Sequence, residues 1–98
     1  MTALTNKQIS KLKGLGQRLE PVVRVGHAGL SDGLFASLNQ ALDDHELVKV
    51  KFADFKDQKK ALAPQLAERS GSQLIMQVGN VVVLYRPQAD PAKQKIQF

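Results

Sequence analysis

The chain of 98 residues contains no cysteine, which excludes disulfide bonds, thiolate catalysis and cysteine-ligated zinc. It also has no tryptophan and only five aromatic residues, so a core must be built mainly from Leu, Val, Ile and Ala. Its apolar runs, such as 81–84, fall far short of the roughly 18–20 residues that a membrane helix needs. The first six residues lack the apolar core of a signal peptide. We therefore expect a cytoplasmic protein that does not bind a membrane.

Catalytic and metal-binding groups are also scarce. The two histidines, His27 and His45, have no cysteine and no carboxylate pair at ligand spacing, so we expect no metal site and no cofactor. Asp43 and Asp44 fall at an expected helix end, and a charged helix end explains them better than metal-dependent phosphoryl transfer. No nucleophile and base are arranged for covalent chemistry. The sequence thus predicts no catalytic residues and no enzyme activity.

Positive charge is present in excess and is unevenly distributed. The formal net charge is +5. Residues 1–30 carry five basic side chains against one acidic, whereas residues 31–70 have a slight acidic excess and 71–98 a small basic one. A basic excess concentrated near the N-terminus indicates an anionic partner such as nucleic acid. The alternative is that these charges serve solubility alone.

The most informative motif is Gly-His-Ala-Gly at 26–29. A β-branched segment over 21–25 precedes it and indicates a strand. Ser31 and Asp32, both good N-cap residues, follow it and precede a helical apolar pattern over 33–44. Free N–H groups and the helix dipole at such a junction favour an anion, and glycine lets a phosphate approach the main chain. The motif therefore indicates a nucleic-acid backbone clamp; a tight turn without a ligand is the alternative.

The segment before this motif predicts an additional helix. Thr5 is its expected N-cap, and Gln8, three residues later, completes a capping-box pattern. Apolar residues then recur three apart, as a helical face requires. Gly14 and Gly16 weaken the last turn, so the helix is expected to end near them.

The segment after the motif predicts three strands and one helix. Alternation over 47–52 indicates a half-buried strand. A helix follows over 57–70, and Pro64 inside it is expected to kink it or to confine regular helix to the part after it. Gly79 and Asn80 separate two apolar segments, 72–78 and 81–85, which is the signal of a two-residue hairpin.

The expected order of elements is helix, strand, helix, strand, helix, strand, strand. Helices between the first three strands favour crossovers, and the last two strands form a hairpin. The predicted fold is α/β, a two-layer sandwich with a four-stranded mixed sheet. We expect one domain over 1–87, a polar and flexible tail over 88–98, and a monomer.

Several stretches match a known family in their order and spacing: Leu-Thr-x-Lys at 4–7, Leu-Lys-Gly-Leu at 12–15, Pro-Val-Val leading to the glycine motif over 21–30, His-Glu-Leu-Val-Lys-Val-Lys at 45–51, and Val-Leu-Tyr-Arg-Pro at 83–87. They resemble the CRM domain, the chloroplast RNA-splicing and ribosome-maturation module, and in particular its stand-alone bacterial YhbY-type RNA-binding proteins. The resemblance implies a KH-like Gly-x-x-Gly loop, RNA binding, and association with precursor large-subunit rRNA in pre-ribosomal particles. Two features depart from the family pattern: Pro64 interrupts a helix, and the loop tip carries no Lys or Arg.

The expected RNA contacts are the four loop residues and the cations of the basic segments. Phosphate contacts of such cations give affinity without sequence specificity. The alternative for each cation is a solvated surface position. The candidate RNA-binding residues are Lys7, Lys11, Lys13, Arg18, Arg24, Gly26, His27, Ala28, Gly29 and Arg86. A second hypothesis is a protein-interaction module that docks to an acidic ribosomal or regulatory protein.

Overall fold

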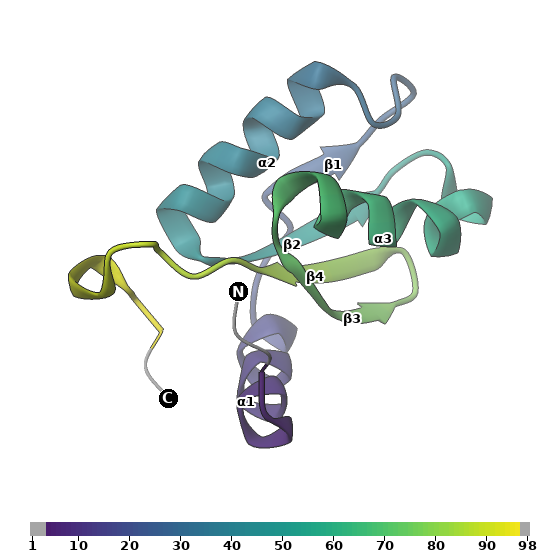
Figure 1. Cartoon of the computed structure of the whole chain (residues 1–98). Helices are drawn as coiled ribbons and strands as arrows, with labels where there is room; N and C mark the ends of the chain where they lie inside the picture. The colour runs from purple at the N-terminus through teal and green to yellow at the C-terminus, as the bar shows by residue number, and fades with distance from the viewer. Residues whose placement is uncertain (1–3, 97–98) are drawn as a thin grey trace.

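A computed structural model describes residues 4–96, so positions 1–3 of the expected domain and 97–98 of the expected tail lie outside the described residues. Helices and strands follow one another in the predicted order (Figure 1). They are α1 (Asn6–Gln17), β1 (Val23–Val25), α2 (Asp32–His45), β2 (Leu47–Phe52), α3 (Lys59–Ser70), β3 (Gln73–Val78) and β4 (Val81–Tyr85), with short 3₁₀ turns η1 (Lys56–Gln58) and η2 (Pro91–Lys93).

The strands form one mixed sheet in the order β1-β2-β4-β3, which confirms the four-stranded mixed sheet. β1 and β2 are parallel and connected through α2, whereas β4 is antiparallel to both of its neighbours. The predicted two-residue hairpin is present: Gly79 has a φ of +56° and Asn80 does not have a positive φ, as a type II′ turn requires. A register shift between Leu74 and Met76 places a bulge in β3, at the edge of the sheet.

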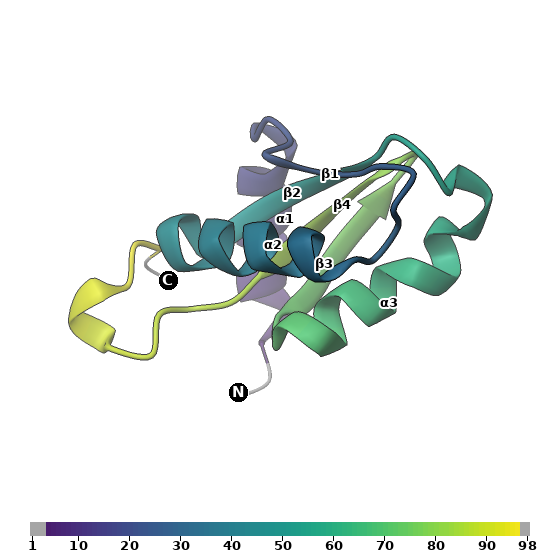
Figure 2. The ribbon, with the colours of Figure 1, turned by 90° about the horizontal axis from the view of Figure 1, so that it is seen from above.

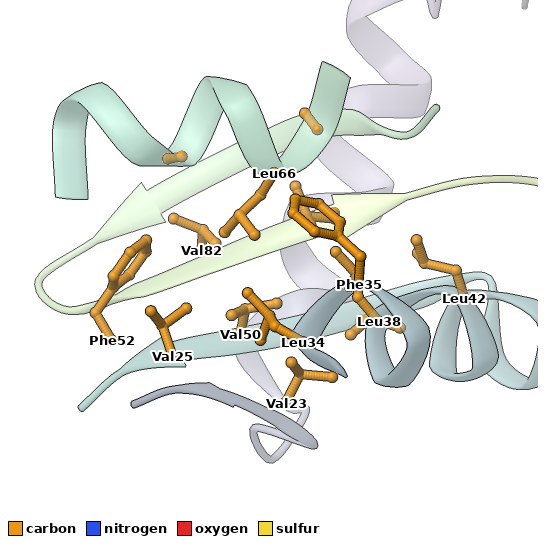
Figure 3. Packing of buried hydrophobic residues seen from close by; sticks show 14 residues of the cluster. Val23, Val25, Leu34, Phe35, Leu38, Leu42, Val50, Phe52, Leu66 and Val82 are labelled. Carbon is orange, nitrogen blue, oxygen red and sulfur yellow. The ribbon is translucent and has the colours of Figure 1, made fainter. Parts of the chain in front are cut away.

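Helices cover both faces of the sheet. α2 and α3 lie on one face, over a main core of Val23, Val25, Leu34, Phe35, Leu38, Leu42, Val48, Val50, Phe52, Ala63, Leu66, Ala67, Val82 and Leu84 (Figure 3). α1 lies on the other face, behind the strands in Figure 2, over a second cluster of Leu12, Leu47, Ile75, Val83 and Tyr85. The predicted sandwich therefore has an additional partial layer. Apolar side chains at one end of this face, such as Leu47 and Val83, require the cover, whereas the alternation over 47–52 had indicated a strand with one face in solvent.

α1 packs closely because it contains a glycine where it meets the sheet. A Cβ added to Gly16 would lie 3.0 Å from Val83 Cγ1, which is too close for an unstrained contact. Gly16 is thus a packing residue, and the helix ends one residue later, near the expected position. The predicted capping box is present, since Thr5 Oγ1 accepts from Gln8 N at 3.1 Å and Gln8 Oε1 accepts from Thr5 N at 2.9 Å.

α3 continues through Pro64, which lies on its exposed side. Proline removes one backbone donor from the helix. The inward side chains Ala63 and Leu66, both fully buried, hold the helix on the sheet on either side of it. Gly71 ends the helix in the left-handed conformation, with φ +68°.

The segment after β4 is docked against the junction of α2 and β2. Glu46, fully buried at that junction, accepts backbone N–H bonds from Gln88 at 2.8 Å, Lys95 at 2.5 Å and Ile96 at 2.9 Å. Ile96 also packs against the second cluster. The polar composition of 88–98 predicts a flexible tail, whereas the structure shows 88–96 bound to Glu46. The carboxylate lies 42 or more residues away in the sequence, so the segment itself carries no sign of this contact.

Candidate nucleic-acid interface

The loop 26–29 is a tight turn between β1 and α2. Gly29 N donates to Gly26 O at 3.0 Å, which closes the turn. Gly29 has a φ of +67°, a conformation that favours glycine, so the turn itself explains this residue. His27 and Ala28, at the tip, are exposed.

Gly26 is different, because the fold does not require a glycine at this position. Its φ is not in the left-handed region, and a Cβ added to it would have no atom within 4 Å. The space in front of Gly26 is therefore open to a ligand, and its backbone is accessible.

α2 begins directly after the loop. Ser31 caps the helix by accepting from Leu34 N at 3.2 Å, and Leu30 packs against the main core. These contacts fix the loop to the start of the helix, where the dipole is positive. Asp32 lies in the first turn and offsets part of that positive potential.

A cleft of about 300 Å³ lies between the loop, β1 and the first turns of α2. Small side chains predominate in its lining, which also includes one cation, Arg24. Gly26, Gly29, Ser31, Gly33 and Ser37 are among the lining residues. Backbone and hydroxyl groups are thus within reach of a ligand there, together with one positive charge.

Arg24 begins a row of cations on the sheet face that α1 partly covers. In the register of the parallel pair it lies opposite Lys51, and Lys49 follows two residues earlier on the same side of β2. Paired strands are about 4.8 Å apart and alternate residues about 6.6 Å apart, so the three cations are close neighbours. Arg24 is exposed, and Lys49 and Lys51 are half-buried.

The cations of α1 divide between two flanks of the helix. Lys7, Lys11 and Arg18 follow at steps of four and seven residues and therefore share one flank, whereas Lys13 lies roughly 160–200° around the helix from Lys11. All four are exposed. Arg18 and Lys49 line the same groove beside the end of α1, so this flank continues into the row on the sheet.

The structure does not place the basic helix beside the glycine loop. Figure 1 shows α1 below the sheet and the connection from β1 to α2 above it. Of the predicted cations, Arg24 lines the cleft next to the loop, and Lys7 and Lys11 line a separate hollow with Thr5 and Gln8.

Arg86 holds the end of β4 in place. Its guanidinium donates to Asn39 Oδ1 at 2.8 Å, to Asn39 O at 3.1 Å and to Ser70 O at 2.7 Å. It also forms an ion pair with Asp43 at 2.8 Å. This geometry gives Arg86 a structural role at the ends of α2 and α3, and RNA contact by Arg86 remains a sequence-based prediction.

Sequence reasoning missed Phe55, which belongs to the surroundings of the loop. A Cβ added to Gly29 would lie 3.4 Å from Phe55 Cε2 and 3.5 Å from Cζ, so the ring borders the turn. Phe55 is 39% exposed. A single Phe among the charged residues 54–60 was its sole signal in the sequence.

The described residues do not form a metal-binding cluster or a helix that could cross a membrane. Within residues 4–96, no three His, Asp or Glu side chains lie close enough together to hold a metal ion. In the same part of the chain, each helix is too short or too polar to cross a membrane.

Comparisons with known proteins agree on one family. The sequence model of the CRS1 / YhbY (CRM) domain family matches residues 4–86 of this chain. A probable RNA-binding protein of Pseudomonas aeruginosa is 40% identical over 92 residues, covering 93% of this chain and 88% of that protein. An RNA-binding protein of Haemophilus influenzae is 39% identical over 88 residues, covering 89% of each chain.

A solved structure supports the same assignment. The solution structure of a hypothetical Staphylococcus aureus protein, described as a candidate RNA-binding protein, superposes with a TM-score of 0.77 at 29% identity. It covers 97% of this chain and 100% of that one. With a family match over nearly the whole length, this chain belongs to the CRS1 / YhbY (CRM) domain family.

Proposed function

We propose that the chain is a cytoplasmic, non-catalytic RNA-binding protein that assists assembly of the large ribosomal subunit. RNA binding is supported by the family and by the names of the bacterial relatives. The observation that carries the site is Gly26, a glycine that the fold does not need, in an exposed turn at the start of a helix. A phosphate that approaches this backbone closely gives a reason for a residue without a side chain.

The proposed RNA path begins at the loop and crosses the sheet. A backbone phosphate contacts the N–H groups of residues 26–29, with His27 at the tip as an additional donor. From there the RNA chain passes Arg24, Lys51 and Lys49 and reaches the end of α1. The flank of Lys7, Lys11 and Arg18 continues this row on the sheet face that α1 covers, away from the loop. RNA that reaches both regions must bend around β1, which favours a structured RNA over a straight duplex.

The assembly role is tested by ultraviolet crosslinking of the protein to RNA in cells, followed by sequencing of the bound RNA. Reads concentrated in one region of large-subunit rRNA are the expected result. Reads spread over many transcripts would refute the assembly role and retain RNA binding. Near absence of crosslinked RNA would refute RNA binding.

A second experiment separates this proposal from docking to an acidic protein. Co-sedimentation with ribosomal particles is measured before and after RNase treatment. Salt-sensitive association is expected for both mechanisms, because both depend on the basic surface. Release by RNase supports the RNA contact, whereas association that survives RNase would contradict it. Depletion of the protein is expected to change the profile of large-subunit precursors.

A further inference from the structure

Phe55 stands out because the chain has few aromatic residues and the others described are buried. Phe35, Phe52 and Tyr85 are at most 9% exposed and belong to the two clusters. Within residues 4–96, Phe55 is the aromatic side chain that solvent reaches, at 39% exposure. Among the described residues, Phe55 therefore offers the aromatic ring with which a ligand in solution could stack.

The backbone of Phe55 adopts an unfavourable conformation. Its φ of 57° and ψ of 33° are left-handed, which is uncommon for a bulky residue with a Cβ. Strain of this kind persists where the surrounding structure fixes it, and it gathers at ligand-binding sites. The hydrogen bonds that fix this segment are Ala53 N and Asp54 N to Val25 O, both 3.0 Å, and Gln58 N to Phe55 O, 3.0 Å.

These bonds attach Phe55 to the glycine loop. Val25, which accepts two of them, is the residue immediately before Gly26. On the other side of the turn, the edge of the ring borders Gly29, which has no side chain to separate the ring from the loop. The ring and the proposed phosphate site are therefore held together by the end of β1.

We propose that Phe55 is a base-stacking residue for an unpaired nucleotide whose phosphate lies on the loop 26–29. This inference rests on the proposed function and deepens it. Recognition of single-stranded RNA combines backbone contacts with bases stacked on aromatic rings. The charge of the surroundings is compatible with RNA, since residues 54–60 carry three lysines against two aspartates. A duplex does not fit this site, because its bases are already paired with each other and stacked on their neighbours.

The absence of tryptophan makes a direct spectroscopic test feasible. Phe55→Trp introduces a single tryptophan, whose emission can be excited apart from that of Tyr85. Leu74→Trp is a matched control because Leu74 is 38% exposed and lies in β3, at the opposite edge of the sheet. The probe is a short single-stranded oligoribonucleotide, compared with the same backbone carrying abasic positions. Quenching at position 55 by the intact oligonucleotide, absent with the abasic one and absent at position 74, is the expected result.

Affinity measurements give an independent readout. Phe55→Leu keeps an apolar side chain with the same backbone strain but removes the aromatic face, and it is expected to weaken binding of the single strand by about fivefold or more. Phe55→Tyr keeps the face and is expected to retain the affinity. Unfolding curves of each variant confirm that the domain is folded.

The outcomes distinguish this inference from the proposed function. If the unmodified protein binds the oligonucleotide and Gly26→Asp weakens binding, but Phe55→Leu binds equally well and Phe55→Trp is not quenched, base stacking is refuted and the phosphate site stands. If the unmodified protein does not bind RNA, both are refuted.

Discussion

Substitution of Gly26 separates a ligand-binding role of the loop from a purely structural one. At Gly26 a side chain meets open space and no left-handed φ, so Gly26→Ala is expected to leave the free energy of unfolding unchanged or to raise it by about 0.4–1 kcal/mol. At Gly29 the φ of +67° makes Gly29→Ala destabilising by about 1–2 kcal/mol. A side chain at Gly26 is therefore expected to weaken RNA binding without lowering the free energy of unfolding. A side chain at Gly29 is expected to lower both the RNA affinity and the free energy of unfolding.

The effect of Gly26→Asp on RNA binding follows from Coulomb's law. A carboxylate roughly 4 Å from a phosphate costs about 1 kcal/mol in bulk water and about 4 kcal/mol at an effective dielectric constant of 20. The exposure of Gly26 favours the lower part of this range. The expected loss of affinity is at least about fivefold, since each 1.4 kcal/mol is a factor of ten.

The assay is titration of a labelled single-stranded oligoribonucleotide at fixed salt, in parallel with denaturant unfolding. Gln65→Glu, at an exposed position of α3, gives the same change of charge away from the loop and is expected to have little effect. Unchanged affinity of Gly26→Asp would refute the phosphate site at the loop. A Gly26→Ala variant that is destabilised would refute the argument that the fold does not need this glycine.

Three further predictions concern the basic helix and the buried polar groups. Lys7→Ala combined with Lys11→Ala is expected to reduce the log–log salt slope of RNA binding by about 1.4, for two lost contacts to a single strand. Glu46→Gln is expected to lower the free energy of unfolding by about 1–3 kcal/mol, measured with denaturant, because an amide cannot accept all three N–H bonds. Burial, and secondarily the charge of Glu46, raises the pKa of Tyr85 above its usual 10.0. The folded state therefore holds this proton more tightly, and stability present below pH 10 is lost as pH rises through the folded-state pKa; Tyr85→Phe is expected to remove this component of alkaline destabilisation.

Each of these predictions has an outcome that contradicts it. The paired variant Arg69→Ala with Lys93→Ala removes the same charge from exposed positions outside the proposed RNA contacts, so an equal change of slope would mean that α1 makes no specific contact. A Glu46→Gln variant as stable as the unmodified protein would exclude a role of the carboxylate in fixing the C-terminal segment. For Tyr85, identical stability profiles of the two proteins above pH 10 would contradict the argument.

The helices, strands and turns were predictable because their signals are local. Thr5 with Gln8, Ser31 and Gly71 mark helix ends through hydrogen bonds or backbone angles a few residues away. Gly79 marks the hairpin in the same way. The four loop residues are contiguous, so their position in the fold followed from the strand before them and the helix after them.

The features that sequence reasoning missed depend on distant parts of the chain. Which face of the sheet α1 covers depends on apolar positions such as Leu47 and Val83, so the separation of its lysines from the loop could not be predicted. Arg86 looked like a surface cation, but its partners Asn39 and Ser70 are 47 and 16 residues away. Phe55 adjoins Gly29 only because β1 and β2 are parallel neighbours, which brings their ends together.

The buried carboxylate of Glu46 also has a consequence for the dynamics of the native protein. Backbone amides of Gln88, Lys95 and Ile96 share one acceptor group, although they come from different parts of the C-terminal segment. Their hydrogens can exchange with solvent only when the segment leaves the carboxylate, so they form one cooperative opening unit. In hydrogen–deuterium exchange these three amides should therefore report the same opening free energy, and that energy should lie below the value for global unfolding.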